Sequence, residues 1–233
     1  MNIVLINPNT TESMTMRMHE VVTPFLGDQV RLTPLTAAFG MASIEGYFDE
    51  AFVVPPMIEL LKPIAGEIDG VVVGCFDDTG VDALRAMLNV PVIGICQAAM
   101  LSASMVATGF SVVTTLPRSV PVIEELALRY GMERRCRRVR AADIPVLALE
   151  EAGSDAREKI RAEVERAVVE DRCEAVILGC AGMTDLPVWL AQETGVPVID
   201  GVVAARHFCR HSDAQTSDPR RMLRSIAAQL AHS

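Results

Sequence analysis

The stretch Asp69-Gly-Val-Val-Val-Gly-Cys75 recurs as Glu174-Ala-Val-Ile-Leu-Gly-Cys180, 105 residues further along the chain. In both places an apolar run with the length of a buried strand ends in Gly-Cys. Two further pairs of blocks repeat in the same order, at offsets of 106 and 109 residues: Asn89–Ile93 with Gly195–Ile199, and Ile3–Ile6 with Val112–Thr115. An ordered set that includes both Gly-Cys corners indicates an internal duplication. The sequence therefore predicts two similar lobes related by a pseudo-twofold axis.

Short β-branched runs alternate along the chain with longer segments of helical spacing, which is the pattern of an α/β fold with mostly parallel sheets. The predicted strands are Ile3–Ile6, Val71–Val73, Val92–Ile95, Ser111–Thr114, Ala175–Leu178 and Val196–Ile199. The predicted helices are Asp82–Leu88, Cys96–Thr108, Val120–Tyr130, Ala156–Val169, Asp185–Glu193 and Val202–His211. We expect residues 1–97 with 205–233 to form the first lobe, residues 98–204 to form the second, and the active site to lie in the cleft between them.

The composition is that of a folded, acidic chain. Of its 233 residues 50% are hydrophobic and 22% are charged, which is not the composition of a disordered protein. The formal net charge is −9, so the basic surface that dominates nucleic-acid affinity is missing. We expect a small-molecule substrate and no nucleic-acid partner.

The sequence carries no recognisable targeting or membrane segment. The N-terminal run Met1–Asn7 lacks a basic region and is too short for a signal peptide, and Val90–Val113 is interrupted by polar residues and Pro91. We therefore expect a cytoplasmic protein with no membrane association. The six cysteines include no Cys-x-x-Cys pair, which argues against a disulfide framework or a zinc site.

Cys75 and Cys180 each follow a predicted strand and precede a predicted helix, so we expect both thiols at the carboxyl edge of a sheet, where α/β folds bind ligands. Asp78 or Thr79 in the first lobe, and Thr184 in the second, have the character of helix N-caps. A thiol beside a helix N-terminus has a lowered pKa, in the range of about 3.5–7.5. We therefore expect each thiol to be a usable base near neutral pH.

Two equivalent thiols that approach a ligand from opposite sides suit one kind of chemistry. Inverting a carbon acid requires one group to remove a proton from one face and a second group to deliver a proton to the other. The two groups titrate as a coupled pair, one thiolate and one thiol at a time. Backbone amides around Phe76–Asp77 and Ala181–Gly182 are placed to hydrogen-bond the developing oxyanion.

Three motifs carry a resemblance to a known family: Ile-Asn-Pro-Asn-Thr-Thr at Ile6–Thr11, Gly-Cys-Phe-Asp-Asp-Thr-Gly at Gly74–Gly80, and Leu-Gly-Cys-Ala-Gly-Met at Leu178–Met183. With them the whole chain resembles the hydantoin and allantoin racemase branch of the aspartate/glutamate racemase superfamily. The resemblance implies cofactor-independent racemisation of a 5-substituted hydantoin, with Cys75 and Cys180 as the acid/base residues. It also implies a homo-oligomer.

The same resemblance assigns the rest of the site. It implies that Asn9 and Thr115 face the hydantoin ring, and that four corner residues supply amides or walls: Phe76, Asp77, Ala181 and Gly182. The Phe-Asp-Asp-Thr-Gly version of the first corner is similar to that of allantoin racemases. The chemistry needs no cofactor, because the C5 proton of a hydantoin is acidified by the ring, and the sequence has no G-x-G-x-x-G, Walker A or H-E-x-x-H motif.

Several alternatives stay open from the sequence. Asp77 and Asp78 have the form of a paired-carboxylate site, and His207 and His211 have helical spacing but lack a third metal ligand. A maleate-type isomerase also retains both cysteines, whereas an arylmalonate decarboxylase lacks the first and an amino-acid racemase carries further polar groups. A two-lobed binding protein would need neither thiol. The segment around Phe39–Tyr47 is either a cover for the cleft or a plain connection.

Overall fold

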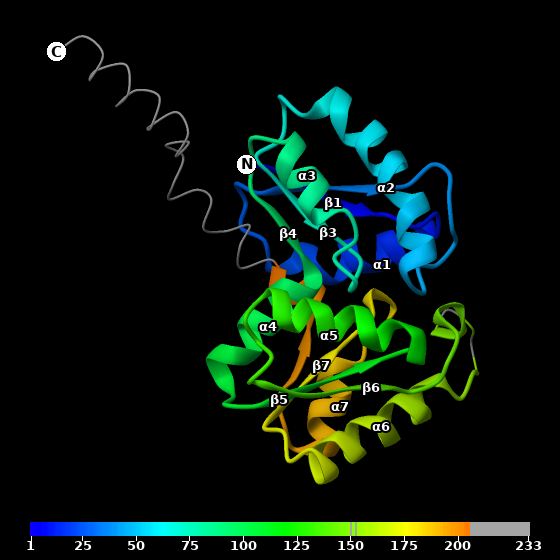
Figure 1. The fold of residues 1–233 in the computed structure, drawn as a ribbon. Helices are drawn as coiled ribbons and strands as arrows, with labels where there is room; N and C mark the ends of the chain where they lie inside the picture. Colours follow the sequence, from blue (N-terminus) through cyan, green and yellow to red (C-terminus); the bar gives the residue numbers. More distant parts are fainter. Residues whose placement is uncertain (150, 152, 206–233) are drawn as a thin grey trace, which may run out of the picture.

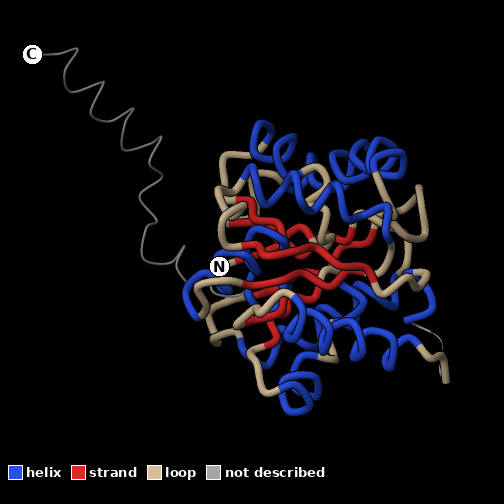
Figure 2. The backbone as a smooth tube through the Cα atoms, turned by 60° about the horizontal axis from the view of Figure 1, so that its bottom comes forward, coloured by secondary structure: helices blue, strands red, loops and turns tan. Residues whose placement is uncertain are grey.

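The computed structural model describes residues 1–149, 151 and 153–205, and in this part the chain forms two four-stranded sheets that are parallel throughout. Figure 1 shows the two sheets in separate lobes, one from the N-terminal part of the sequence and one from the later part. In Figure 2 the strands lie at the centre of the molecule with helices around them. The prediction of a two-lobed α/β fold is confirmed.

The first sheet has the order β2-β1-β3-β4. Its strands are β1 (Asn2–Asn7), β2 (Arg31–Thr36), β3 (Gly70–Val73) and β4 (Val92–Gly94). The helices of this part are α1 (Glu12–Val22), α2 (Tyr47–Leu61) and α3 (Val81–Met87), after which α4 (Ile95–Val106) crosses to the second lobe.

The second sheet has the equivalent order β6-β5-β7-β8. Its strands are β5 (Phe110–Thr114), β6 (Cys136–Ala141), β7 (Ala175–Leu178) and β8 (Val198–Asp200). Its helices are α5 (Val120–Arg129), α6 (Ala156–Glu170) and α7 (Pro187–Thr194), and residues 201–205 are again helical. Both halves thus use the same order of central and edge strands, as a duplicated unit should.

The strand register corrects one of the three sequence matches. Ile6 pairs with Val73 in the first sheet, and Val113 pairs with Leu178 in the second. Ile6 therefore corresponds to Val113, an offset of 107 rather than 109 residues. Because side chains alternate with a period of two, a shift of two residues keeps every side chain on its own face, and apolar strands cannot reveal it.

The hydrophobic core has three parts that follow the alternation along the strands. Outward-facing residues such as Val4 pack under α2 and α3, and their counterparts in the second lobe, such as Val176, pack under α6 and α7. Inward-facing residues of both sheets, among them Leu5 and Ile177, join α4 in a single cluster that spans the two lobes. Strands buried on both faces favour apolar residues at successive positions, which explains their largely apolar sequences.

Two strands were not predicted, and both are edges. The strands β2 and β6 flank β1 and β5, and their residues are mostly exposed or half-buried. The basic run Arg134–Arg138 enters β6 at Cys136. Pro34 sits within β2, where an edge strand tolerates it because one side of the strand has no partner. Edge strands with polar faces lack the apolar signature of central ones.

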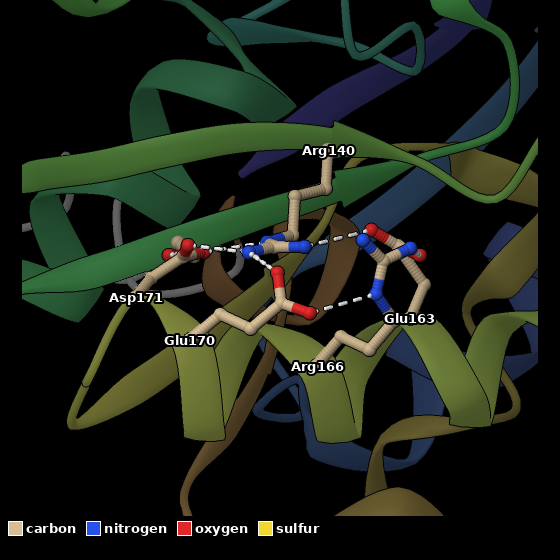
Figure 3. Close-up of polar contacts among 6 residues, drawn as sticks. Arg140, Glu163, Arg166, Glu170 and Asp171 are labelled. Carbon is tan, nitrogen blue, oxygen red and sulfur yellow. Dashed lines mark hydrogen bonds and ion pairs between the residues drawn. The ribbon is translucent and has the colours of Figure 1, made fainter.

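A buried guanidinium ties β6 to α6 (Figure 3). The side chain of Arg140 is only 3% exposed and forms ion pairs with Glu163 at 3.1 Å, Glu170 at 2.7 Å and Asp171 at 2.5 Å. Arg166 bridges Glu163 and Glu170 from the solvent side. Burial alone would raise the pKa of Asp171, but hydrogen bonds from Arg140 and Ser111 outweigh burial, and the pKa is lowered.

Some predictions fall on residues outside those described. The assignment of 205–233 to the first lobe concerns almost entirely such residues, as do Cys209, His207 and His211, and the lobe boundaries stay a prediction. Within the described ranges, no helix has both the length and the apolar character that a membrane crossing requires.

Candidate active site

Glycines fix the two corners that follow β3 and β7. The N–H of Gly74 donates to the carbonyl of Ile6 at 2.8 Å, and the N–H of Gly179 donates to the carbonyl of Val113 at 2.7 Å. A Cβ on Gly74 would lie 2.8 Å from the Met18 sulfur, and one on Gly179 would lie 2.9 Å from the Thr114 Cβ. Only glycine fits such close approaches, so the strand ends hold the following cysteines at equivalent places.

Both cysteines line one cavity of about 410 Å³, its open mouth included, between the two lobes. All eight residues singled out from the sequence line it: Asn9, Cys75, Phe76 and Asp77 from the first lobe, and Thr115, Cys180, Ala181 and Gly182 from the second. The structure brings these residues together, whereas their chemical roles stay predictions. The cavity lies at the carboxyl ends of the central strands, where ligands bind in parallel α/β sheets.

Seven further residues line the cavity that sequence reasoning did not assign to it: Met14, Ile44, Gly74, Thr114, Ser119, Val146 and Gly179. The two glycines belong to the repeated motif, and Thr114 directly precedes Thr115, so these three were within reach of the sequence argument. Ile44 lies in the Phe39–Tyr47 segment, which therefore contributes one residue to the lining. No feature of the sequence indicated that Met14, Ser119 and Val146 would line the cavity.

The two thiols are held in the same way. The backbone N–H of Asp77 donates to the sulfur of Cys75, and the backbone N–H of Gly182 donates to the sulfur of Cys180. In each case the donor is two residues beyond the cysteine, so the corners are alike in detail. These two amides therefore face the sulfur atoms in the structure. The Thr79 hydroxyl, 3.7 Å from the Cys75 sulfur, adds a second donor in the first lobe.

The expectation of a lowered thiol pKa is wrong. Burial raises the pKa of Cys75 well above its ordinary value and that of Cys180 to about 12, and the Asp77 carboxylate acts in the same direction on both. The hydrogen bonds from the amides lower both values but are outweighed. The expected helix N-terminus is absent at the first sulfur, since α3 begins only at Val81. At the second, only the short 3-10 helix Ala181–Met183 begins directly after Cys180, and α7 follows at Pro187.

The expected helix caps are wrong as well. Gly80, with φ of 77°, precedes α3, and Leu186 precedes α7. Asp78 caps α4 instead: its carboxylate accepts hydrogen bonds from the N–H groups of Cys96 at 2.9 Å and Gln97 at 3.0 Å. It also accepts one from the Tyr130 hydroxyl at 2.7 Å, so it ties the first corner to the second lobe. Sequence could not show this, because the capped residues lie 18 and 19 positions away.

Asp77 and Asp78 do not form a paired-carboxylate site in the cavity. Asp77 lines the cavity, whereas Asp78 is engaged with α4 and is not part of the lining. Burial raises the pKa of Asp77 to about 8, with a further contribution from the neighbouring Glu50 and Asp78 carboxylates. The same cause raises the pKa of Asp78 to about 6.

Asn9 and Thr115 are placed by the backbone around them. The Asn9 side-chain oxygen accepts hydrogen bonds from the Asn7 side chain and the Thr11 N–H, each at 2.9 Å, and this turn keeps the residue 8% exposed at the cavity. The carbonyl of Thr115 accepts a hydrogen bond from the N–H of Ile144 at 3.0 Å. Both are therefore rigid parts of the lining.

The charge of the lining limits what the cavity can bind. Among the described residues that line it, the titratable groups are the two thiols and the Asp77 carboxyl, and none is a lysine, arginine or histidine. A substrate carboxylate would therefore find no counter-charge, and a neutral molecule is the better fit. In the described part of the chain, no three residues of the kinds that bind metal ions are clustered.

Comparison with known proteins identifies the family. The model of the Asp/Glu/hydantoin racemase family matches residues 3–209. A hydantoin racemase of Rhizobium meliloti is 50% identical over 206 residues, which are 88% of this chain and 86% of that protein. A hydantoin racemase of Pseudomonas sp. (strain NS671) is 41% identical over 209 residues, which are 89% of this chain and 84% of that protein.

Solved structures agree with the sequence comparison. Allantoin racemase from Klebsiella pneumoniae superposes with a TM-score of 0.87 at 40% identity, covering 91% of this chain and 87% of that one. Allantoin racemase from Pseudomonas fluorescens superposes with a TM-score of 0.87 at 36% identity, covering 93% and 91%. The chain belongs to the Asp/Glu/hydantoin racemase family and is an isomerase, a racemase of its hydantoin and allantoin branch.

Proposed function

We propose that the protein racemises 5-substituted hydantoins, with allantoin favoured, by passing the C5 proton between Cys75 and Cys180. The observation that carries the proposal is that thiols from equivalent corners of two lobes line a single cavity with no cationic side chain among its described residues. Two weak acids of the same kind can exchange roles, so the reaction runs in both directions.

The chemistry of a hydantoin suits this lining. Removal of its C5 proton gives an enolate delocalised over the ring, so a thiolate is a sufficient base and no cofactor is required. The reacting thiolate accepts the amide hydrogen bond of its own corner, from Asp77 or from Gly182, which favours its charged form. We propose that Asn9 and Thr115 orient the ring, while Phe76 and Ala181 complete its walls.

The charge of the substrate distinguishes hydantoin racemisation from the competing reactions on amino acids and maleate. Amino acids and maleate carry carboxylates, and burying one without a partner is costly. A hydantoin is neutral. The preference for allantoin is supported by the Phe-Asp-Asp-Thr-Gly sequence of the first corner. The likeness to two allantoin racemase structures is consistent with it.

The function is tested by polarimetry of the purified protein with single enantiomers of allantoin and of 5-alkyl and 5-aryl hydantoins. L-Glutamate is the control in this assay. Isomerisation of maleate is followed separately by absorbance. We expect loss of rotation with hydantoins, fastest with allantoin and without any added cofactor. Activity on glutamate or maleate in place of hydantoins would contradict the proposal.

The raised thiol pKa values predict the pH dependence of the reaction. Because the free protein holds both thiols protonated at neutral pH, the fraction with one thiolate grows about tenfold per pH unit until the lower pKa of the pair is reached. We expect kcat/KM for allantoin to rise steadily from pH 6.5 to 9, measured by circular dichroism. A plateau already below pH 7 would show that a thiolate is present at rest.

A cytoplasmic location and a homo-oligomeric state remain proposals. The first lobe offers an apolar surface for self-association, since Phe39, Phe48 and Phe52 are each more than half exposed. The ring centroids of Phe48 and Phe52 lie 4.9 Å apart, with the ring planes tilted by 49°. Light scattering of the purified protein measures the oligomeric state directly.

A further inference from the structure

One oxygen of the Asp77 carboxyl group is buried at the cavity without a hydrogen-bond partner. The residue is 7% exposed, and its Oδ2 accepts no hydrogen bond in the structure. Buried polar atoms are almost always hydrogen-bonded, because leaving one unpaired costs about 1–3 kcal/mol. A ligand that enters the cavity can supply the missing partner, since Asp77 is part of the lining.

The position of this carboxyl is tied to the reacting centre. The backbone N–H of Asp77 donates to the Cys75 sulfur, so the side chain starts at the same corner that holds the thiol. If Cys75 acts on C5 of a ring in the cavity, groups attached to C5 come within reach of the Asp77 carboxyl. No equivalent side chain exists in the second lobe, where the matching residue is Gly182.

The surroundings of Asp77 define the kind of group it can bind. Its charged neighbours are the carboxylates of Glu50, Asp78 and Asp49, and together with burial they raise its pKa. An anionic substituent is therefore repelled. A neutral group with N–H donors is accepted by the carboxyl in either protonation state, since a carboxyl oxygen remains an acceptor in both.

We propose that Asp77 determines substrate specificity: its side chain accepts a hydrogen bond from an N–H group on the C5 substituent and so selects ureido-type substituents over alkyl ones. The assignment rests on the proposed function and extends it to the substrate class. An alkyl substituent would bury the carboxyl and leave it unpaired, and sites of this kind discriminate strongly against analogues that lack the hydrogen-bonding group.

The test compares allantoin with 5-(2-methylpropyl)hydantoin, whose substituent has the same number and branching of heavy atoms as the ureido group but no N–H. The quantity measured is the ratio of kcat/KM for the two compounds, by circular dichroism at one pH. We expect Asp77→Leu to lower the allantoin-to-alkyl ratio by about 10–100-fold. Asp77→Asn, which keeps the shape and one acceptor oxygen, should lower it less.

The ratio of the two kcat/KM values separates the hydrogen bond of Asp77 to the substituent from the electrostatic effect of its charge on the thiols. The charge of Asp77 acts on both thiols, so the electrostatic effect of removing it changes the rates of both compounds alike and cancels in the ratio, whereas loss of the hydrogen bond slows allantoin alone. Glu50→Gln is the matched control, because Glu50 is a neighbouring half-buried carboxyl outside the lining. We expect it to preserve the ratio.

The outcomes are distinct. If the wild-type protein racemises neither compound, the proposed function falls and this assignment falls with it. If it racemises both while Asp77→Leu and Asp77→Asn leave the ratio unchanged, or slow both compounds equally, the function stands and only the assignment of Asp77 is overturned. Should Asp77→Leu be inactive with both compounds, the ratio for Asp77→Asn decides.

Discussion

Replacing either Cys75 or Cys180 with serine is expected to lower the rate of racemisation by at least about 10²–10⁴-fold, the usual contribution of one general acid or base. A serine hydroxyl is a far weaker acid than a thiol and can neither remove nor return the C5 proton near neutral pH. Since both thiols line the same cavity and each serves one face of the substrate, loss of either should stop the reaction in both directions. Polarimetry with allantoin measures the effect.

Exchange of the C5 proton with solvent deuterium distinguishes this scheme from general damage. With one thiol left, each single mutant should still exchange the proton of one enantiomer, and the two mutants should act on opposite enantiomers. Proton NMR in D₂O follows the exchange. Cys136→Ser is the matched control, because this half-buried cysteine lies in β6 and outside the cavity lining. Undiminished racemisation by both mutants, or exchange of the same enantiomer by both, would reject the two-base scheme.

The second large effect is expected on stability. Arg140→Met should reduce the free energy of unfolding by about 3–5 kcal/mol, because it leaves Asp171, whose side chain is 5% exposed, as a buried charge without its cation. Denaturant unfolding followed by circular dichroism measures the change. Arg161→Met, which removes an ion-pairing arginine from the exposed side of α6, should leave the unfolding midpoint nearly unchanged.

The pH dependence of this effect has a definite sign. The pKa of Asp171 is lowered in the folded protein, so its ionised form contributes stability above the ordinary value of 3.8 and loses it as the pH falls through the folded-state pKa. The difference between the wild-type protein and Arg140→Met should therefore narrow as the pH falls below 3.8. An equal difference at pH 7 and pH 3 would show that the guanidinium contributes through packing rather than through its charge.

The sequence predicted the strands that are buried on both faces, because such burial requires mostly apolar residues. The central strands β1, β3, β5 and β7 are mostly apolar, and the Gly-Cys corners that follow β3 and β7 predicted residues that line the cavity. The edge strands β2 and β6 were missed because contact with solvent on one side permits residues such as Thr33 and Arg137.

Properties that depend on residues far away in the sequence could not be predicted from local sequence patterns. The helix-capping role of Asp78 depends on where α4 begins, and the raised pKa of Cys75 depends on how completely the two lobes enclose it. The local sequence after each cysteine indicated the start of an α-helix, but α3 and α7 begin several residues later in the structure. Local pattern thus predicted the place of the thiols but not their electrostatic environment.

The inner cluster around α4 has a consequence for how the duplicated halves behave. Because inward-facing residues of both sheets and of α4 share a single apolar core, removing one half would expose the inward-facing apolar residues of the other. The halves are therefore not modular: the chain should melt in one cooperative step, and an excised half should aggregate rather than fold. A protein assembled from two copies of one unit has in this way become indivisible.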